Sequence, residues 1–497
     1  MIDPFRAVIS AFLVVSSVWS LGAQETKING VLLGTPPPGI EEVLDALNAR
    51  LKLDLGVRLE LAYIGWNEVN SKYPLVLAAG EGVDWIYTAS WAPYTTQAVR
   101  GAFKELSPEI LKAAMPRHWA ATPAEAWDQA RVGGKIFMVP TATPDRKVPM
   151  ALIRGDLRRK YGLAPVVRVA DLEPYLAAVK KNEPDMVPID LGNGYDIGQP
   201  FFALLNEGVP PIAAPFFGTV YGNYEDPAHG LVNLLDEPWR TVFRKAAVTV
   251  KRWYDKGYIN RAPFANPTLS KQSFAQGKSA VGFGNSQDLQ EALALAENRG
   301  FDPEIIPILS STGHSNADSY TGNGVAIAAG SKNWEKSLQV LDRLMEDPDY
   351  ARTAAFGVEG KHWMLTPEGK VALPPGVNPG ENPYPVEAGG FWFVNKDLLP
   401  PLASWSPSYR DHRDRLKLLL VPNTFVDFAF VPTKVKNEVA AITTVMAQYG
   451  DVISIGAVVN VDKAIAALEA QLKAAKQDKV IDELRRQLKA HYTRSKP

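Results

Sequence analysis

Several aromatic residues stand beside small polar residues, and this combination has the clearest chemical use in the chain. They are Trp66 next to Asn67, Trp91 after Ser90, Tyr195 after Asn193-Gly194, and Trp392 after Gly389-Gly390. A flat ring stacks on the apolar face of a pyranose, while nearby amides, hydroxyls and carboxylates hydrogen-bond the sugar hydroxyls. Core packing is the simpler explanation for any single ring. Their grouping at expected strand ends favours a binding role.

The motifs of the common catalytic sites are absent from the sequence. No Gly-x-Ser-x-Gly, His-Glu-x-x-His, phosphate-binding loop or dinucleotide-binding glycine pattern occurs. The histidines lie far apart, with no two at ligand spacing: His118, His229, His314, His362, His412 and His491. We therefore expect no cofactor and no metal site. A pair of carboxylates facing each other across a cleft, as in a glycoside hydrolase, cannot be recognised from sequence and stays open.

Composition excludes several classes of function. The 497 residues carry a net charge of −1, with no basic block of the kind that a nucleic-acid partner requires. The chain has no cysteine, which excludes disulfides, thiol nucleophiles and zinc–thiolate sites. No segment after residue 23 holds the run of about 18 apolar residues that a membrane span needs. We expect an exported protein of two or three domains.

The first 23 residues have the layout of a secretory signal peptide. Arg6 precedes an apolar run from 7 to 19, small residues follow, and Ala23 stands before a polar stretch. A buried N-terminal helix is the alternative. Without a cysteine after the leader, the mature protein cannot carry the lipid of a bacterial lipoprotein. We therefore expect it to be free in the periplasm of a bacterium with two membranes.

The elements that must position the rings alternate between strand and helix. Residues 27–33, 57–64 and 83–87 are expected strands, separated by helices over 40–51 and 73–79. This order predicts right-handed crossovers and a largely parallel sheet. Ligands of such sheets bind beyond the carboxyl ends of the strands, here Thr88-Ala89-Ser90-Trp91.

The rest of the chain continues this α/β pattern and then becomes helical. A further expected strand, 279–283, is followed by the polar loop Gly284-Asn285-Ser286. Residues 182–230 are rich in Gly, Pro and aromatics, and we expect irregular structure there. The tail is expected to form helices over 434–449, 462–475 and 478–492, with a break over 450–461.

Several segments in a fixed order resemble the extracellular solute-binding proteins of ABC importers, in the lipoprotein-type subgroup. They are residues 77–87 (LAAGEGVDWIY), 274–283 (FAQGKSAVGF), 324–344 (GVAIAAGSKNWEKSLQVLDRL), 356–362 (FGVEGKH), 431–442 (VPTKVKNEVAAI) and 472–483 (LKAAKQDKVIDE). Each segment is weak alone, but their order and spacing make the set specific. The missing lipid-bearing cysteine departs from many members of this subgroup.

The resemblance implies a periplasmic-binding-protein-like fold of two α/β lobes with a hinge and a cleft between them. Lobe one would combine residues 24–143 with 312–355, and lobe two 144–311 with 358–430. Residues 431–497 would form a helical extension. The crossings between lobes would fall at 141–149, 310–316 and 356–362.

The resemblance also implies a ligand held in the cleft and delivered to the transmembrane subunits of a permease. We expect Trp66, Trp91 and Trp392 to be stacking platforms, with Tyr195 beside them. The expected polar contacts are Ser90, Asn193, Asn285 and Glu359, the last because it lies in the proposed third crossing. A monomer is the default state of this family.

An oligosaccharide is the favoured ligand, because of the aromatics and the absence of a charged pocket signature. The same architecture also binds peptides and other solutes, and fold alone does not settle the ligand. Three further classes of protein stay open at this point: a secreted glycoside hydrolase, a ligand-free scaffold, and a sensor that presents ligand to a membrane receptor.

Overall fold

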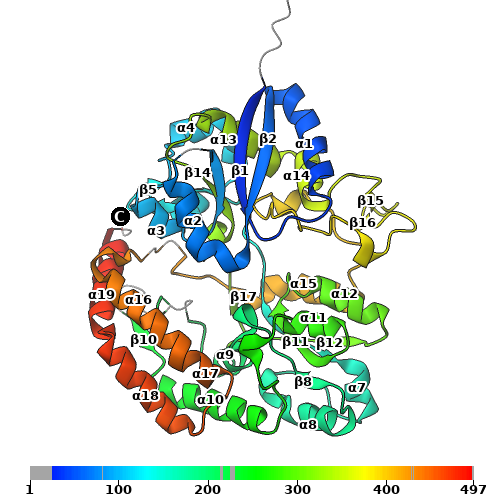
Figure 1. Ribbon diagram of the computed structural model, residues 1–497, viewed down its shortest axis with the longest axis vertical. Helices are drawn as coiled ribbons and strands as arrows, with labels where there is room; N and C mark the ends of the chain where they lie inside the picture. The colour runs from blue at the N-terminus through cyan, green and yellow to red at the C-terminus, as the bar shows by residue number, and fades with distance from the viewer. Residues whose placement is uncertain are drawn as a thin grey trace, which may run out of the picture.

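Two separate β-sheets organise the chain into two bodies, one above the other in Figure 1. The computed structural model describes residues 25–80, 82–212, 216–223, 230–426, 428 and 430–494. The predicted signal peptide, 1–23, lies outside these ranges. We call the body around the sheet that contains β1 (Thr26–Leu33) the first lobe, and the body around β7 (Pro149–Arg154) the second lobe.

The sheet of the first lobe has five strands in the order β2-β1-β3-β14-β6. Besides β1 they are β2 (Val57–Ile64), β3 (Trp85–Thr88), β6 (Val139–Pro140) and β14 (Gly324–Ile327). β1 runs parallel to β2 and β3, which confirms the parallel arrangement that the strand–helix order predicts. β14 returns from the second half of the chain and pairs antiparallel with β3 and β6. The carboxyl ends of β1, β2 and β3 therefore meet at one edge, which points toward the second lobe in Figure 1.

Helices cover the first sheet with their apolar faces. They are α1 (Ile40–Leu55), α2 (Val69–Ala78), α3 (Tyr94–Val99), α4 (Pro108–Ala114), α5 (Pro116–Ala121), α6 (Ala124–Gln129), α13 (Trp334–Glu346) and α14 (Pro348–Phe356). Along α1 the buried side chains recur at helical spacing, as Ile40, Val43, Leu44, Leu47 and Leu51. The short hairpins β4 (Arg131–Val132) with β5 (Lys135–Ile136) and β15 (Met364–Leu365) with β16 (Val371–Ala372) complete the lobe.

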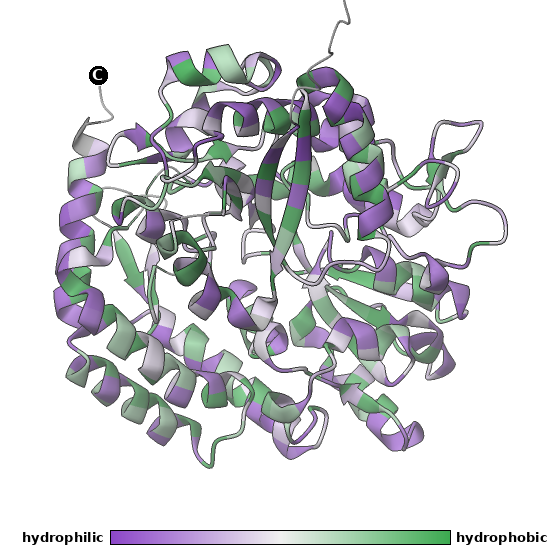
Figure 2. Cartoon of the chain, turned by 45° about the horizontal axis from the view of Figure 1, so that its top comes forward, coloured by the Kyte–Doolittle hydropathy of each residue, from purple (hydrophilic) through white to green (hydrophobic). Residues whose placement is uncertain are grey.

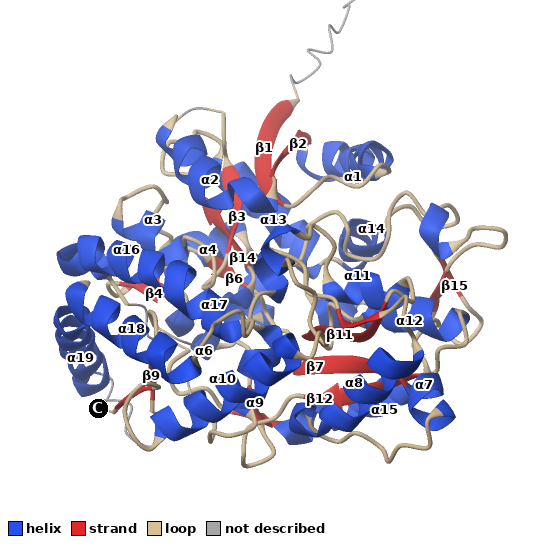
Figure 3. Cartoon of the chain, turned by 60° about the horizontal axis from the view of Figure 1, so that its bottom comes forward, coloured by secondary structure: helices blue, strands red, loops and turns tan. Residues whose placement is uncertain are grey.

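The sheet of the second lobe has the order β12-β7-β11-β8, and Figure 3 shows it with helices around it. The other strands are β8 (Val187–Ile189), β11 (Ser279–Asn285) and β12 (Pro303–Pro307), with a small pair, β9 (Val220–Gly222) and β10 (Leu231–Asn233). The helices are α7 (Gly155–Lys160), α8 (Glu173–Asn182), α9 (Gln199–Asn206), α10 (Trp239–Asp255), α11 (Ser270–Ala275), α12 (Gln290–Asn298) and α15 (Pro407–Leu419). The expectation of irregular structure over 182–230 is thus wrong in part, because β8, α9 and β9 lie there. Phe201, Ala203 and Leu205 of α9 fill a buried space next to α10.

The chain passes between the lobes three times in the described ranges. The first passage joins β6 to β7, and the second joins β12 to β14, with β13 (Ser315–Asn316) pairing there with β17 (Leu420–Val421). The expected third crossing at 356–362 is wrong. Trp363, Tyr384 and Phe393 are buried in the core of the first lobe. Leu402 still pairs with Val371 of β16 there, so the chain leaves that lobe only between 403 and 405. The assignment of the whole of 358–430 to lobe two is corrected for the same reason.

The helical tail is part of the second lobe's core. It comprises α16 (Lys436–Val445), a π-helical turn η9 (Met446–Gly450), α17 (Asp451–Ser454), α18 (Val461–Ala474) and α19 (Gln477–Arg494). The predicted break over 450–461 begins late, since α17 continues the helix before the chain turns at Gly456 (φ 78°). Apolar and polar residues alternate around these helices in Figure 2. The buried set is Val435, Ile442, Ile453, Ile455, Val461, Ile465, Leu468, Leu472, Val480, Leu484 and Leu488.

No helix in the described part of the chain combines the length and the apolar composition that a membrane crossing requires.

Candidate functional site

The carboxyl ends of the parallel strands carry two of the predicted aromatic residues. Trp66 follows β2 after Gly65, and Trp91 follows β3 after Ala89-Ser90. At the end of β1, Gly34 adopts φ 107°, and a side chain at this position would meet the indole of Trp66 at 3.4 Å. The positive φ favours glycine here, and the Trp66 ring lies in ordinary van der Waals contact with the end of β1. Both rings therefore lie at the strand edge where the sequence predicts a ligand site.

The three predicted tryptophans form one cluster. The Trp66 ring stacks on Trp392, with centroids 5.5 Å apart and planes inclined by 18°. It also meets Trp91 at 6.1 Å in a tilted arrangement. Trp91 donates its indole N–H to the Gly322 carbonyl at 2.7 Å, and Trp392 donates to the Glu387 carbonyl at 3.1 Å. Both rings are thus held in place by their N–H groups.

The cluster leaves two large apolar rings half exposed. Trp66 is 52% exposed and Trp91 is 55% exposed, whereas Trp392 is partly buried against the core of the first lobe. Exposed aromatic groups of this size on a rigid frame are typical of binding surfaces. Phe391 and Phe393 on either side of Trp392 are buried instead. These residues form a turn, in which the Val394 amide donates to the Phe391 carbonyl at 3.1 Å, and the middle ring of the three meets Trp66.

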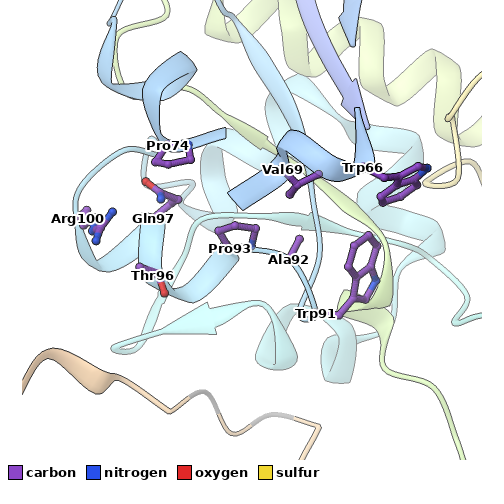
Figure 4. A pocket seen from close by; sticks show the side chains of 9 residues that line it. All are labelled: Trp66, Val69, Pro74, Trp91, Ala92, Pro93, Thr96, Gln97 and Arg100. Atoms are coloured by element: carbon purple, nitrogen blue, oxygen red, sulfur yellow. The ribbon is translucent and has the colours of Figure 1, made fainter. Parts of the chain in front are cut away.

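Trp66 and Trp91 line one end of a hollow of roughly 570 Å³ in the first lobe, seen in Figure 4. Its remaining wall is Val69, Pro74, Ala92, Pro93, Thr96, Gln97 and Arg100. The hollow thus has aromatic rings at one end and polar groups of α3 at the other. None of these lining residues is an Asp or a Glu, so the hollow offers no carboxylate pair for glycoside hydrolysis.

A polar group of the second lobe lies at the end of β11. Asp288 accepts hydrogen bonds from Tyr195 at 2.9 Å and from Asn285 at 2.6 Å. Burial, together with the Asp288 carboxylate, raises the pKa of Tyr195, which keeps its proton and donates. Gln287 from the same loop donates to Glu387 at 2.7 Å, and Glu387 belongs to the loop that carries Trp392. The structure therefore brings this polar group to the boundary with the aromatic cluster.

Three other predicted contact residues are placed differently. Glu359 is exposed and lines a small hollow with Arg50 of α1 and Arg352 of α14, on a part of the first lobe separate from the cluster. The expectation that it borders the cleft fails together with the third crossing. Ser90 is exposed and its amide donates to the Thr321 carbonyl beside Trp91. Asn193 is exposed two residues before Tyr195.

Buried charges gather at the first passage between the lobes, beside a short helical turn of the first lobe over 396–398. The Asp145 carboxylate, 7% exposed, lies 2.8 Å from the ammonium groups of both Lys147 and Lys396. Burial alone would raise the pKa of Asp145, but these two cations hold it well below its ordinary value. Lys396 also lies 3.0 Å from Glu387. Sequence reasoning missed this cluster, because its members are 251 residues apart along the chain (Asp145 to Lys396) and share no spacing pattern.

The pKa of Asp318, on the second passage, shifts in the opposite direction to the pKa of Asp145. It accepts a hydrogen bond from the Lys147 amide at 2.8 Å. Burial raises its pKa to about 6, Lys147 opposes the rise, Asp145 adds to it, and Lys396 opposes it weakly. A carboxyl whose pKa is higher in the folded chain than in the unfolded chain stabilises the fold at low pH and loses this contribution as the pH rises through 6.

We therefore expect Asp318→Asn to stabilise the protein at neutral pH. Asparagine keeps an acceptor for the Lys147 amide and never ionises. The gain in unfolding free energy over the parent should be near zero at about pH 4 and reach about 2 kcal/mol at about pH 7. Denaturant unfolding of both proteins across this range measures it. Comparing the two removes the opposing effect of His412, whose pKa burial and the nearby Arg415 and Arg413 lower to about 4. A gain independent of pH would contradict the assignment.

The described residues contain no group of three or more His, Asp and Glu side chains placed to hold a metal ion.

Comparisons with known proteins agree with this geometry. Residues 424–493 match the model of a domain of unknown function, DUF3502. A carbohydrate ABC transporter substrate-binding protein of Streptococcus pneumoniae serotype 4 is 26% identical over 468 residues, which cover 92% of this chain and 89% of that protein.

Solved structures of low sequence identity share the fold. The N-glycan transport solute binding protein NgtS of Streptococcus pneumoniae has a TM-score of 0.76 at 23% identity, covering 95% of this chain and all of that one. The same protein in complex with Man5GlcNAc has a TM-score of 0.73, also at 23% identity, with the same coverage. The alginate-binding protein AlgQ2 has a TM-score of 0.68 at 17% identity, covering 94% and 98%. The periplasmic-binding-protein-like fold and the resemblance to the extracellular solute-binding proteins of ABC importers, both expected from the sequence, are confirmed by these comparisons.

Proposed function

We propose that this protein captures an oligosaccharide between its two lobes and delivers it unaltered to the transmembrane subunits of an importer. The observation that carries the proposal is the cluster of Trp66, Trp91 and Trp392 at the carboxyl ends of the first sheet, with two rings half exposed. Indole rings bind the apolar faces of pyranoses, and the polar end of the hollow suits the hydroxyls of a sugar chain. The name of the curated relative supports the same ligand class.

Capture requires that the two lobes close on the ligand. Closure is a hinge motion about the three passages, and ligand drives it only if the closed form binds more tightly. Tyr195, Asn285 and Asp288 on the second lobe are our candidates for the polar groups that close over the aromatic platform. Ser90 and Asn193 are candidates for further contacts from each lobe.

Among carbohydrates, mannose-containing N-glycans are our first candidates, because a structural neighbour was solved with Man5GlcNAc bound. The protein would work as a monomer outside the cytoplasmic membrane. No catalytic step is included in this proposal. A nucleic-acid partner is not expected for a chain with a net charge of −1.

Calorimetric titration with a panel of glycans tests the proposal. The panel contains Man5GlcNAc, shorter mannosides, alginate oligosaccharides, fructo-oligosaccharides and a mixed peptide set. We expect saturable binding of at least one oligosaccharide, with a change in tryptophan fluorescence and recovery of the intact sugar. Binding of peptides alone would show that the ligand is a peptide and not an oligosaccharide. Cleavage of a bound sugar would show that the protein hydrolyses its ligand and does not deliver it intact.

A further inference from the structure

The side-chain amide of Asn323 joins the charge cluster at the passages to the aromatic cluster, in addition to the link that Glu387 makes between Lys396 and Trp392. Asn323 is buried on the second passage, just before β14. Its side-chain nitrogen donates to Asp145 at 2.7 Å, and its side-chain oxygen accepts from the hydroxyl of Tyr87 at 2.6 Å. Tyr87 is the third residue of β3, and its ring meets Trp91 at 6.1 Å and Trp392 at 5.4 Å.

The chemistry of these groups leaves one arrangement of hydrogen atoms. Asp145 is held ionised by Lys147 and Lys396, and an ionised carboxylate only accepts hydrogen bonds. Asn323 must therefore turn its NH₂ toward Asp145, which turns its oxygen toward Tyr87. The Tyr87 hydroxyl must then donate. Burial, reinforced by Asp145, raises the pKa of Tyr87 well above its ordinary value, so this proton stays in place.

Groups on two passages and on the first lobe contribute to this connection. Asp145 and Lys147 lie on the first passage and Asp318 and Asn323 on the second. Lys396 lies in a short helical turn of the first lobe, 396–398, before the third passage. A rotation of the lobes about the passages must displace these groups relative to one another. Asn323 directly precedes Gly324 of β14, which pairs with Thr88 next to Tyr87, so its backbone stays with the first sheet. A displaced Asp145 therefore acts on the Asn323 side chain and through it on the hydrogen bond to the Tyr87 hydroxyl. The Tyr87 ring contacts two of the three tryptophans.

We propose that Asn323 is a positioning residue that couples the relative orientation of the lobes to the arrangement of the Trp66–Trp91–Trp392 platform. Asn323 itself acts through Tyr87 rather than on the ligand. The expected effect of Asn323 on ligand affinity rests on the proposed function. Its expected effect on the arrangement of the tryptophan rings does not, so the coupling and the proposed function can fail separately.

The test compares Tyr87→Phe, Asn323→Ala and the double variant with the parent. Tyr87→Phe keeps the ring and removes only the hydroxyl. Each single variant should weaken binding of the glycan found by titration by about fivefold, which is the effect of one lost hydrogen bond. The double variant should be no weaker than the weaker single variant, because both changes break the same connection. Tyr350→Phe is the matched control, since its buried hydroxyl donates to Asp54 elsewhere in the first lobe.

A second readout needs no ligand. Tryptophan emission of the unliganded protein, excited where tyrosine does not absorb, should shift in Tyr87→Phe, in Asn323→Ala and in Asp145→Asn, and not in Tyr350→Phe. If the parent binds no glycan, the proposed function fails and the emission still decides the coupling. Unchanged emission, or affinity losses that add fully in the double variant, would overturn the inference and leave the function standing. If Asp145→Asn does not fold, the other two variants decide.

Discussion

Trp66→Ala is expected to weaken oligosaccharide binding by about 100-fold. Trp66 stacks on Trp392, contacts Trp91 and is itself 52% exposed at the mouth of the hollow. Its removal takes away its own stacking surface and the support of its neighbours, and truncation of such an aromatic anchor costs about 2.7 kcal/mol, which is a factor of about 100. Titration calorimetry with the best glycan of the panel measures the effect.

The control for this variant is an exposed ring outside the cluster. Phe264, 48% exposed, lies in the second lobe after α10, and Phe264→Ala should leave the affinity within about twofold. An equal loss in both variants would show a general effect of removing surface aromatics. If Trp66→Ala bound the glycan with the affinity of the parent, the aromatic cluster would not be part of the binding site.

Leu468→Ala is expected to lower the unfolding free energy by about 3 kcal/mol. Leu468 of α18 is fully buried in the same core as α9 and α10, and deleting three buried carbons leaves a cavity in addition to the lost transfer free energy. Leu53→Ala in α1 is the matched control, because Leu53 is also a helical leucine and is 86% exposed. Denaturant unfolding should show an effect of less than about 0.5 kcal/mol for it.

This variant tests whether the tail is a structural part of the second lobe or an appended module. An effect of Leu468→Ala no larger than that of Leu53→Ala would mean that α18 does not belong to the core. A separate, earlier unfolding transition of the tail would lead to the same conclusion. In either case the domain matched over 424–493 would be an appended module on the second lobe and not a part of its core.

The periodic parts of the fold could be predicted from the sequence. β1, α1 and β2 carry their patterns over eight residues or more, and the observed bounds lie within four residues of those expected. The end of β3 lies at the expected edge of the sheet, because parallel strands share that edge. The tail helices were predicted from their periodicity as well, through the apolar spacing of residues such as Ile465, Leu468 and Leu472.

The non-periodic parts could not be predicted, because long-range packing decides them. The segment around Trp363 and Tyr384 has no pattern that assigns it to a lobe, and its burial against the first sheet places the third passage at 403–405. Glu359 is not part of the site for the same reason. The cluster of Asp145, Lys147 and Lys396 joins the first passage to a turn of the first lobe that is distant in sequence, which no local spacing records.

The most direct test of the central claim is small-angle X-ray scattering of the protein with and without a saturating amount of the glycan identified by titration. Closure of two lobes about the three passages predicts a smaller radius of gyration in the presence of that glycan, and no change with a sugar that does not bind. An unchanged radius at full saturation would contradict capture of the ligand between the lobes.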